Sequence, residues 1–285
     1  MRSRISCVNC ILSNVLDLAS RHIEDVAVQE RFYRRVMAVA EGLDFSESPP
    51  EHARHLYRIL RQELGGKDVY RQEKERSTNF ALQLLPELYS RLAALPEDKQ
   101  FEYMVKMAIG GNIIDYGALK EVDFRRVRES LDKIAAAELS IEALELLEKK
   151  FAAAKRILYL GDNCGELVFD RLLLERYKEK TTLAVRGFEV LNDATISDAA
   201  ASGIDFLPVI DTGDATPGVS LRYSSRKFID ALGGADLIVA KGQGNYETLE
   251  GSDLPIVFLF RVKCPVLRRH FNCRFGEYMV INQLD

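Results

Sequence analysis

The sequence predicts an α/β protein with a Rossmann-like, mostly parallel sheet that has helices on both faces and follows an all-helical N-terminal domain. Apolar residues recur at helical spacing through the first half of the chain, and no clear strand is found before residue 155. Short apolar runs then alternate with helical stretches, and strands buried on both faces are typical of parallel sheets covered by helices. We therefore expect two domains, a helical one over residues 1–152 and an α/β one over residues 153–285 that carries the functional site.

The helical half begins with three apolar stripes, around Val15, Val36 and Ile59. Longer helices are expected further along this half of the chain, over residues 79–95, 101–109 and 123–149. Glycines and prolines separate these segments, at positions 49–50, 65–66, 96 and 110–111.

The strands of the second half are expected at six short apolar runs. These runs cover residues 156–160, 181–185, 206–210, 237–240, 255–260 and 279–281. Helical stretches are expected between several of them, over residues 167–178, 196–202 and 224–232. This alternation predicts a parallel sheet with crossover helices.

The composition is that of a globular protein rather than a disordered one, since 47% of the 285 residues are apolar and 29% are charged. A formal net charge of −4 gives no basis for broad binding to nucleic acid or to an anionic membrane. No apolar run approaches the roughly 20 residues of a spanning helix, and the N-terminal segment does not have the pattern of a signal peptide. An odd number of cysteines, five, favours a reducing cytoplasm over a disulfide framework. We expect a cytoplasmic protein without nucleic-acid or membrane partners, and its oligomeric state stays open.

Polar residues follow four of the expected strands. The segments are GDNCGE at 161–166, Arg186-Gly187 followed by LNDAT at 191–195, KGQGN at 241–245, and RVKC at 261–264. In open α/β sheets, ligands bind beyond the carboxyl ends of the strands. The four segments therefore predict one site at one edge of the sheet.

The residue types in these segments point to phosphate chemistry. Asp162, Asn163 and Asp193 offer hard oxygen ligands, which suit Mg²⁺ or Mn²⁺. Positive charge for an anion comes from a second group of side chains, Arg186, Lys241, Arg261 and Lys263. A divalent ion facing such cations predicts phosphoryl transfer or hydrolysis, with Glu166 placed to orient water or to protonate the leaving alkoxide.

Each segment also has a simpler interpretation. Asp162-Asn163 and Asn192-Asp193 could cap the helices that follow them, and KGQGN could be a plain turn. Cys7 and Cys10 suggest zinc, but a structural zinc site usually needs four ligands and the spacing identifies no second pair. We expect His52 and His55 on a solvated helix face, and residues 71–76 on an exposed helix.

The ordered set of motifs resembles the damage-control phosphatases, also known as domain of unknown function 89. The matching segments are GGNIID at 110–115, GDNCGE at 161–166, LNDAT at 191–195, KGQGNYETL at 241–249 and FRVKC at 260–264. The N-terminal Cys7-x-x-Cys10 resembles the short, stand-alone prokaryotic members of the family. The resemblance covers essentially the whole chain.

The resemblance implies a metal-dependent phosphatase that acts on sugar phosphates or damaged phosphorylated metabolites. It implies a divalent ion, Mn²⁺, Mg²⁺, Co²⁺ or Ni²⁺, held by Asp162, Asn163 and Asp193, with Lys241 suited to the substrate phosphate. The expected substrate-binding residues are Asn112, Asp115, Arg186, Asn192, Asn245 and Lys263. Because Asn112 and Asp115 come from the helical half, the cleft is expected between the two domains.

Three other functions remain open from the sequence alone. A Rossmann-like domain with an acidic, glycine-containing loop could hold S-adenosylmethionine for methyl transfer, although the DN pair and the basic residues argue against this. A non-catalytic phospho-ligand-binding protein and a cysteine-metal redox or scaffold protein are the other two. Within the phosphatase hypothesis, the nucleophile is either metal-activated water or an aspartate.

Overall fold

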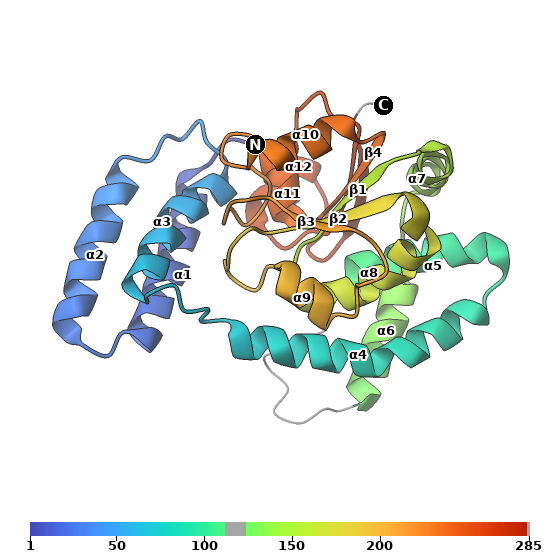
Figure 1. The fold of residues 1–285 in the computed structure, drawn as a ribbon, viewed down its shortest axis with the longest axis horizontal. Helices are drawn as coiled ribbons and strands as arrows, with labels where there is room; N and C mark the ends of the chain where they lie inside the picture. The colour runs from blue at the N-terminus through green and yellow to red at the C-terminus, as the bar shows by residue number, and fades with distance from the viewer. Residues whose placement is uncertain (112–123, 284–285) are drawn as a thin grey trace.

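The computed structural model describes residues 1–111 and 124–283 of the chain (Figure 1). The helices before the sheet are α1 (Ile5–His22), α2 (Val26–Glu41), α3 (Pro49–Glu63), α4 (Arg71–Ala93), α5 (Glu97–Gly110), α6 (Phe124–Ala135) and α7 (Ile141–Ala153). Helices α1–α3 lie at one end of the molecule, and the long helix α4 runs beneath α8 and α9 in the view of Figure 1. The expected helical N-terminal half is thus confirmed.

The prediction of a single helix over residues 123–149 is wrong, because the helix is interrupted between α6 and α7. The Ser140 side chain caps the second helix by accepting a hydrogen bond from the backbone N–H of Ala143. Such a cap satisfies an N–H group that has no partner within the helix, so a new helix begins here.

Six strands form one sheet in the order β3-β2-β1-β4-β5-β6. They are β1 (Ile157–Leu160), β2 (Thr181–Val185), β3 (Val209–Asp211), β4 (Leu237–Lys241), β5 (Ile256–Arg261) and β6 (Tyr278–Asn282). The first five run parallel and β6 is antiparallel to β5, so the expected mostly parallel sheet is confirmed. Strand β3 begins three residues later than expected, just after Pro208, which has no N–H to donate to a neighbouring strand.

Helices cover both faces of this sheet. They are α8 (Cys164–Arg176), a short 3-10 turn η2 (Lys178–Lys180), α9 (Ile196–Ala201), α10 (Arg226–Gly234), α11 (Gly242–Leu249) and α12 (Pro265–Phe271). The two short helices α11 and α12 were not expected from the sequence. Helix α11 begins at Gly242, directly where β4 ends, so the KGQGN segment is not a plain turn.

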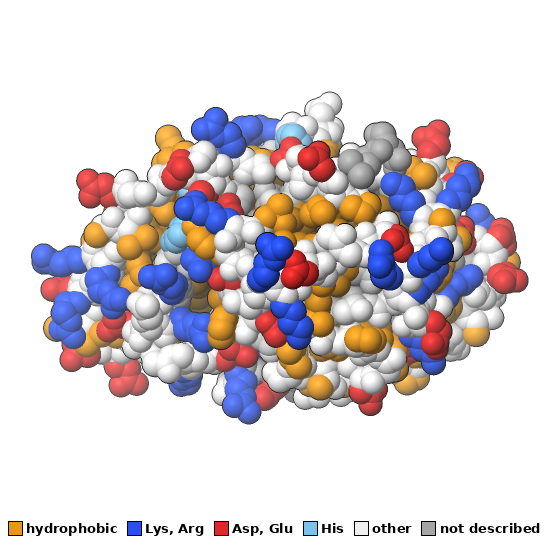
Figure 2. Space-filling model, turned by 45° about the horizontal axis from the view of Figure 1, so that its top comes forward, with side chains coloured by type: hydrophobic (Ala, Val, Ile, Leu, Met, Phe, Trp, Pro, Cys, Tyr) orange, Lys and Arg blue, Asp and Glu red, His pale blue; other side chains and the backbone are white. Residues whose placement is uncertain are grey.

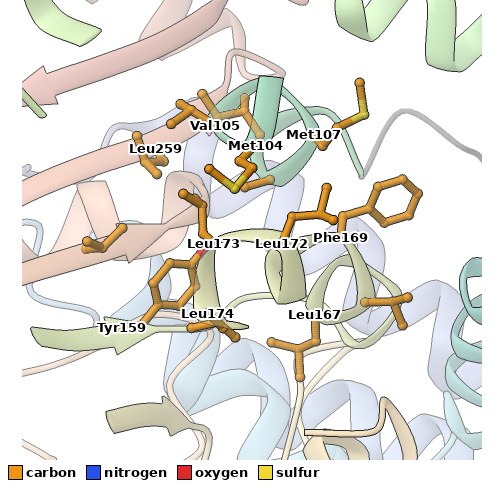
Figure 3. Packing of buried hydrophobic residues seen from close by; sticks show 14 of the residues in the cluster. Met104, Val105, Met107, Tyr159, Leu167, Phe169, Leu172, Leu173, Leu174 and Leu259 are labelled. Atoms are coloured by element: carbon orange, nitrogen blue, oxygen red, sulfur yellow. The ribbon is translucent and has the colours of Figure 1, made fainter. Parts of the chain in front are cut away.

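Helix α8 is the centre of the largest hydrophobic core. Figure 3 shows its side chains Leu172 and Phe169 on the side that faces Met104 and Met107 of α5, whereas Leu167 points to the opposite side of the helix. The same cluster includes residues of α4, α7 and the sheet, while α10, α11 and α12 pack on a second cluster with the strands. Helices α1–α3 have a third cluster of their own. The domain boundary expected after residue 152 stays a prediction. Helices α4–α7 share a hydrophobic core with the sheet.

One expectation about the surface is wrong, and a second, the exposed helix over residues 71–76, holds except at Lys74. His52 is fully buried and its Nε2 lies 2.8 Å from the carbonyl oxygen of Asp44, while His55 Nε2 lies 3.0 Å from a Glu47 carboxylate oxygen. Lys74, inside the run expected to be exposed, is also buried. In both regions, oxygen atoms of neighbouring segments lie within bonding distance of these side-chain nitrogens. Among the described residues, no helix is long and apolar enough to cross a membrane.

Candidate active site

The polar segments meet at the carboxyl ends of β1, β2, β4 and β5, around a cavity of about 200 Å³. The predicted site residues that line it are Asp162, Asn163, Glu166, Asn192, Asp193, Arg261 and Lys263. Three other predicted residues, Arg186, Lys241 and Asn245, are at most 1% exposed and do not line the cavity. The expected edge of the sheet therefore holds a polar cleft with a second layer of buried polar groups.

Backbone hydrogen bonds join the first two segments. Asn163 and Asp193 form an isolated antiparallel bridge. The N–H of Ala194 donates to the Asp162 carbonyl oxygen at 2.8 Å, and the N–H of Cys164 donates to the Asn192 carbonyl oxygen at 3.1 Å. The positions of both aspartates are thus fixed by main-chain contacts rather than by flexible side chains alone.

Neither Asp162-Asn163 nor Asn192-Asp193 serves as a side-chain helix cap. Asn163 occupies the N-cap position of α8, but its side chain accepts no capping bond and instead donates to Glu166 Oε1 at 2.6 Å. Helix α9 is capped by Thr195 in a reciprocal arrangement with Asp198. The simpler interpretation of these pairs as caps does not describe the structure.

One buried guanidinium is shared by both aspartates. Arg186 Nε lies 2.6 Å from Asp193 Oδ2, and its Nη2 lies 3.6 Å from Asp162 Oδ1. Its Nη1 donates to Asn245 Oδ1 at 3.3 Å. Burial raises the pKa of the Asp162 carboxyl well above its usual range, and the negative charges of Asp193 and Glu166 add to this rise, while Arg186 opposes it. Burial also raises the pKa of Asp193 against the effect of Arg186.

Lys241 lies in a second buried ion pair that the sequence did not predict. Its Nζ lies 2.7 Å from Asp170 Oδ1 and 3.6 Å from Glu166 Oε2, and the Tyr159 hydroxyl donates to Asp170 at 2.8 Å. Burial raises the pKa of Asp170 to about 6, with Lys241 opposing the rise. Burial lowers the pKa of Lys241, but Asp170 and Glu166 outweigh it, so the pKa is raised and the ammonium keeps its charge.

A sequence signal for Asp170 exists. It follows Glu166 by four residues, which places both acids on one face of α8, inside a helix that is otherwise almost entirely apolar over residues 164–174. An acid in such surroundings is rarely buried without a cationic partner.

Gly242 allows the start of α11 to approach the Asp162 side chain more closely than a residue with a side chain could. Its φ is +81°, and a Cβ atom at this position would lie 2.1 Å from Asp162 Oδ2. Gln243 then joins the ends of β4 and β5, because its Oε1 accepts from the N–H groups of Lys263 at 2.8 Å and Cys264 at 3.2 Å.

A model of the ARMT1-like damage-control phosphatase domain matches residues 4–279. The chain belongs to this damage-control phosphatase family. It is 32% identical to a damage-control phosphatase of Pyrococcus horikoshii, with 97% of this chain and 96% of that protein covered. It is 30% identical to a damage-control phosphatase of Archaeoglobus fulgidus, with 95% and 96% covered. The crystal structure of a DUF89 family protein from P. horikoshii superimposes with a TM-score of 0.89 at 28% identity and covers 99% of both chains.

The family membership expected from the motifs is therefore confirmed, including the likeness to stand-alone archaeal relatives over the full length. Asn112 and Asp115, expected to bind substrate in this damage-control phosphatase family member, lie outside the described residues. The five cysteines are free, Cys7 buried and Cys10 exposed. Within residues 1–111 and 124–283, no group of three or more His, Cys, Asp and Glu side chains is arranged to hold a metal.

The predicted ligand set of this family member has two carboxylates and one amide, and its chemistry fits a hard divalent ion. Asp162 and Asp193 repel each other in a site that is largely closed to water. The Asn163 amide nitrogen donates to Glu166 and to Asp162 Oδ2, the latter at 3.3 Å, so its oxygen makes no bond to these acids. Oxygen donors of this kind at a cavity wall suit Mg²⁺ or Mn²⁺.

Proposed function

We propose that this protein is a divalent-metal-dependent phosphatase that hydrolyses small phosphate monoesters, such as sugar phosphates or damaged phosphorylated metabolites, in the cytoplasm. The observation that carries the proposal is the pair Asp162 and Asp193, which face one guanidinium at the wall of a polar cavity. Family membership supports the reaction class. The cavity of about 200 Å³ suits a small phosphorylated molecule.

We assign the ion to Asp162, Asn163 and Asp193. When bound, it supplies polarisation of the phosphoryl oxygens and a lowered pKa for a water molecule. Arg186 holds both aspartates in place through its hydrogen bond and ion pair. Asn245 in turn orients Arg186 and is itself anchored, since its Nδ2 donates to the Lys241 carbonyl oxygen at 2.7 Å.

The remaining polar groups would receive the substrate. Lys263 is exposed at the cavity and provides positive charge for the phosphate. Glu166 faces the same cavity and would orient water or protonate the leaving alkoxide, as Asn163 fixes its carboxylate at 2.6 Å. Lys241 was expected to contact the phosphate. Because its ammonium is bonded to Asp170 and lies close to the Glu166 carboxylate, we instead assign it the role of holding Glu166 in position.

A phosphate-release screen tests the proposal. Wild-type protein is assayed on hexose phosphates and other phosphorylated metabolites with Mg²⁺, Mn²⁺, Co²⁺ and Ni²⁺, and with EDTA. Asp162→Asn and Asp193→Asn should each lower kcat/KM by at least about 100-fold, since each removes an anionic ligand of the proposed metal ion. Asp205→Asn, a matched change at an exposed site of the same half of the chain, should leave the rate unchanged.

Three results would contradict the proposal. Full activity in the Asp162→Asn and Asp193→Asn proteins would exclude these side chains from the reaction. Tight binding of phosphorylated ligands without phosphate release under any metal would favour the non-catalytic binding protein. Calorimetric binding of S-adenosylmethionine with no metal effect would favour the methyltransferase.

A further inference from the structure

A second cavity, of about 160 Å³, lies between α3 and the segment that follows β2. We call it the arginine pocket. It is lined by Arg54, Arg58 and Arg61 on the helix side and by Phe188 and Val190 on the opposite side. The three arginines are four and three residues apart, which places them on one face of α3.

The acids of the arginine pocket are already paired with other groups. Asp214 binds Arg54 Nε with both carboxylate oxygens, at 2.9 and 2.8 Å. Glu189 is bound by the buried ammonium of Lys74. Among the described residues, no carboxylate pairs with Arg58 or Arg61, so both guanidinium groups are available to an anion. Figure 2 shows Lys and Arg side chains, with Asp and Glu side chains among them, at the end of the molecule that α1–α3 form.

Arg61 is held in a way that leaves its N–H groups available. Its guanidinium carbon lies 4.6 Å from the centre of the Phe188 ring. Contact with an aromatic ring engages the face of a guanidinium, whereas its N–H donors point outward in the plane and match the oxygens of a phosphate or carboxylate. A stacked arginine without an acid partner is therefore suited to bind an anion.

The arginine pocket and the active-site cavity share no lining residue, but a third cavity shares residues with both. This small cavity shares Tyr57, Arg61 and Val190 with the arginine pocket and also reaches Leu191, and Leu191 lines the active-site cavity too.

We propose that the arginine pocket binds a second anionic group, a phosphate or carboxylate, of the substrate whose phosphate monoester lies in the active-site cavity. This inference rests on the proposed phosphatase function and names the substrate class as doubly anionic. Arg58 and Arg61 are its specificity-determining residues.

The test compares two matched substrates, a hexose 1-phosphate and the corresponding hexose 1,6-bisphosphate. In wild-type protein, kcat/KM for the bisphosphate should exceed that for the monophosphate. The Arg58→Gln/Arg61→Gln protein should lose about 10-fold or more on the bisphosphate, because charge-assisted hydrogen bonds are lost, and less than about 2-fold on the monophosphate. Arg34→Gln, a change on an exposed part of α2, serves as the matched control and should alter neither substrate.

A binding measurement separates this proposal from the proposed function. Calorimetry with the bisphosphate in EDTA should show weaker binding to the double variant than to wild type, whether or not any ester is hydrolysed. Phosphate release with no preference for the bisphosphate would contradict the proposed role of the arginine pocket, but not the proposed phosphatase function. Equal losses of kcat/KM on both substrates in the double variant would do the same. If sulfate still binds the arginine pocket when the bisphosphate is present, the pocket is an anion site separate from the substrate site. That result would also contradict its proposed role in substrate binding.

Discussion

At the scale of single residues, Gly242 is the tightest constraint on the site. Its positive φ of +81° disfavours any side chain, and a Cβ would lie 2.1 Å from Asp162 Oδ2. We expect Gly242→Ala to displace the Asp162 carboxylate and to lower kcat/KM by about 10-fold or more. It should also lower the free energy of unfolding by about 1–2 kcal/mol. Phosphate release and denaturant unfolding measure the two effects.

The matched control is Gly233→Ala in α10, where a Cβ meets no atom within 4 Å and no positive φ is required. That protein should keep wild-type activity and be as stable as wild type or slightly more so. Equal activity of the Gly242→Ala and Gly233→Ala proteins would show that the position of the Asp162 carboxylate does not matter for turnover.

Asp170 gives the folded protein a pH dependence. Its pKa is raised from the usual 3.8 to about 6, so the folded state binds this proton more tightly than the unfolded state does. The stabilising contribution of the protonated Asp170 carboxyl is therefore full below about pH 4 and is lost as the pH rises through about 6. The groups around it are Lys241, Glu166 and Tyr159.

Replacing Asp170 by Asn removes this titration. Between pH 4 and 6, the free energy of unfolding of wild type should fall relative to that of Asp170→Asn, by up to about 1.4 kcal/mol per pH unit. Urea unfolding at several pH values measures the difference. A constant difference between the two proteins over this range would mean that Asp170 is already ionised at pH 4.

At the scale of elements, Lys74 ties the start of α4 to the segment that carries Asp193. Its Nζ lies 3.4 Å from Asp68 and 3.2 Å from Asp198 and also binds Glu189, while only 2% of the residue is exposed. Removing the cation would leave three partly buried carboxylates close together. We expect Lys74→Ala to cost about 3–5 kcal/mol of folding free energy and to lower kcat, because Glu189 and Asp198 flank Asp193 along the chain.

Arg76→Ala is the appropriate comparison, since Arg76 is exposed on the same turn of α4. Its stability should stay within about 0.5 kcal/mol of wild type. If the Lys74→Ala protein is destabilised but keeps full kcat below its melting temperature, the ion cluster stabilises the fold without positioning Asp193.

The same elements show what the sequence can and cannot predict. Strands such as 181–185 and 237–240 were predicted because a buried parallel strand is a local apolar run, and the position of Asp162 follows from the end of such a run. Lys74 and Asp170 were missed as parts of the site because the partners that bring them to it lie 71 to 124 residues away in sequence, Glu189 and Asp198 for Lys74 and Lys241 for Asp170. Local periodicity carries no information on such pairs.

At the scale of the whole molecule, α1–α3 have their own hydrophobic cluster, and polar contacts join them to the α/β part. Examples are Arg54 with Asp214 and Glu51 with Ser220, the latter at 2.6 Å. The arginine pocket lies along this contact, with one wall from each side. Under the proposed role of the arginine pocket, substrate specificity can vary at α3 while the aspartates keep their positions in the segments after β1 and β2.

The stability of the whole molecule should also report metal binding. Asp162 and Asp193 have raised pKa values, so their protonated forms favour folding at low pH, and this contribution is lost as the pH rises through those values. A divalent ion needs the ionised carboxylates and would replace the proton as the stabilising partner at higher pH. Added Mn²⁺ or Mg²⁺ at 100 times the Kd measured at pH 8 should thus raise the free energy of unfolding by about 2.7 kcal/mol at that pH. The same metal concentration should give a smaller gain at pH 5. Thermal unfolding of wild type, Asp193→Asn and Asp205→Asn measures this, and an equal gain in all three would place the ion away from Asp193.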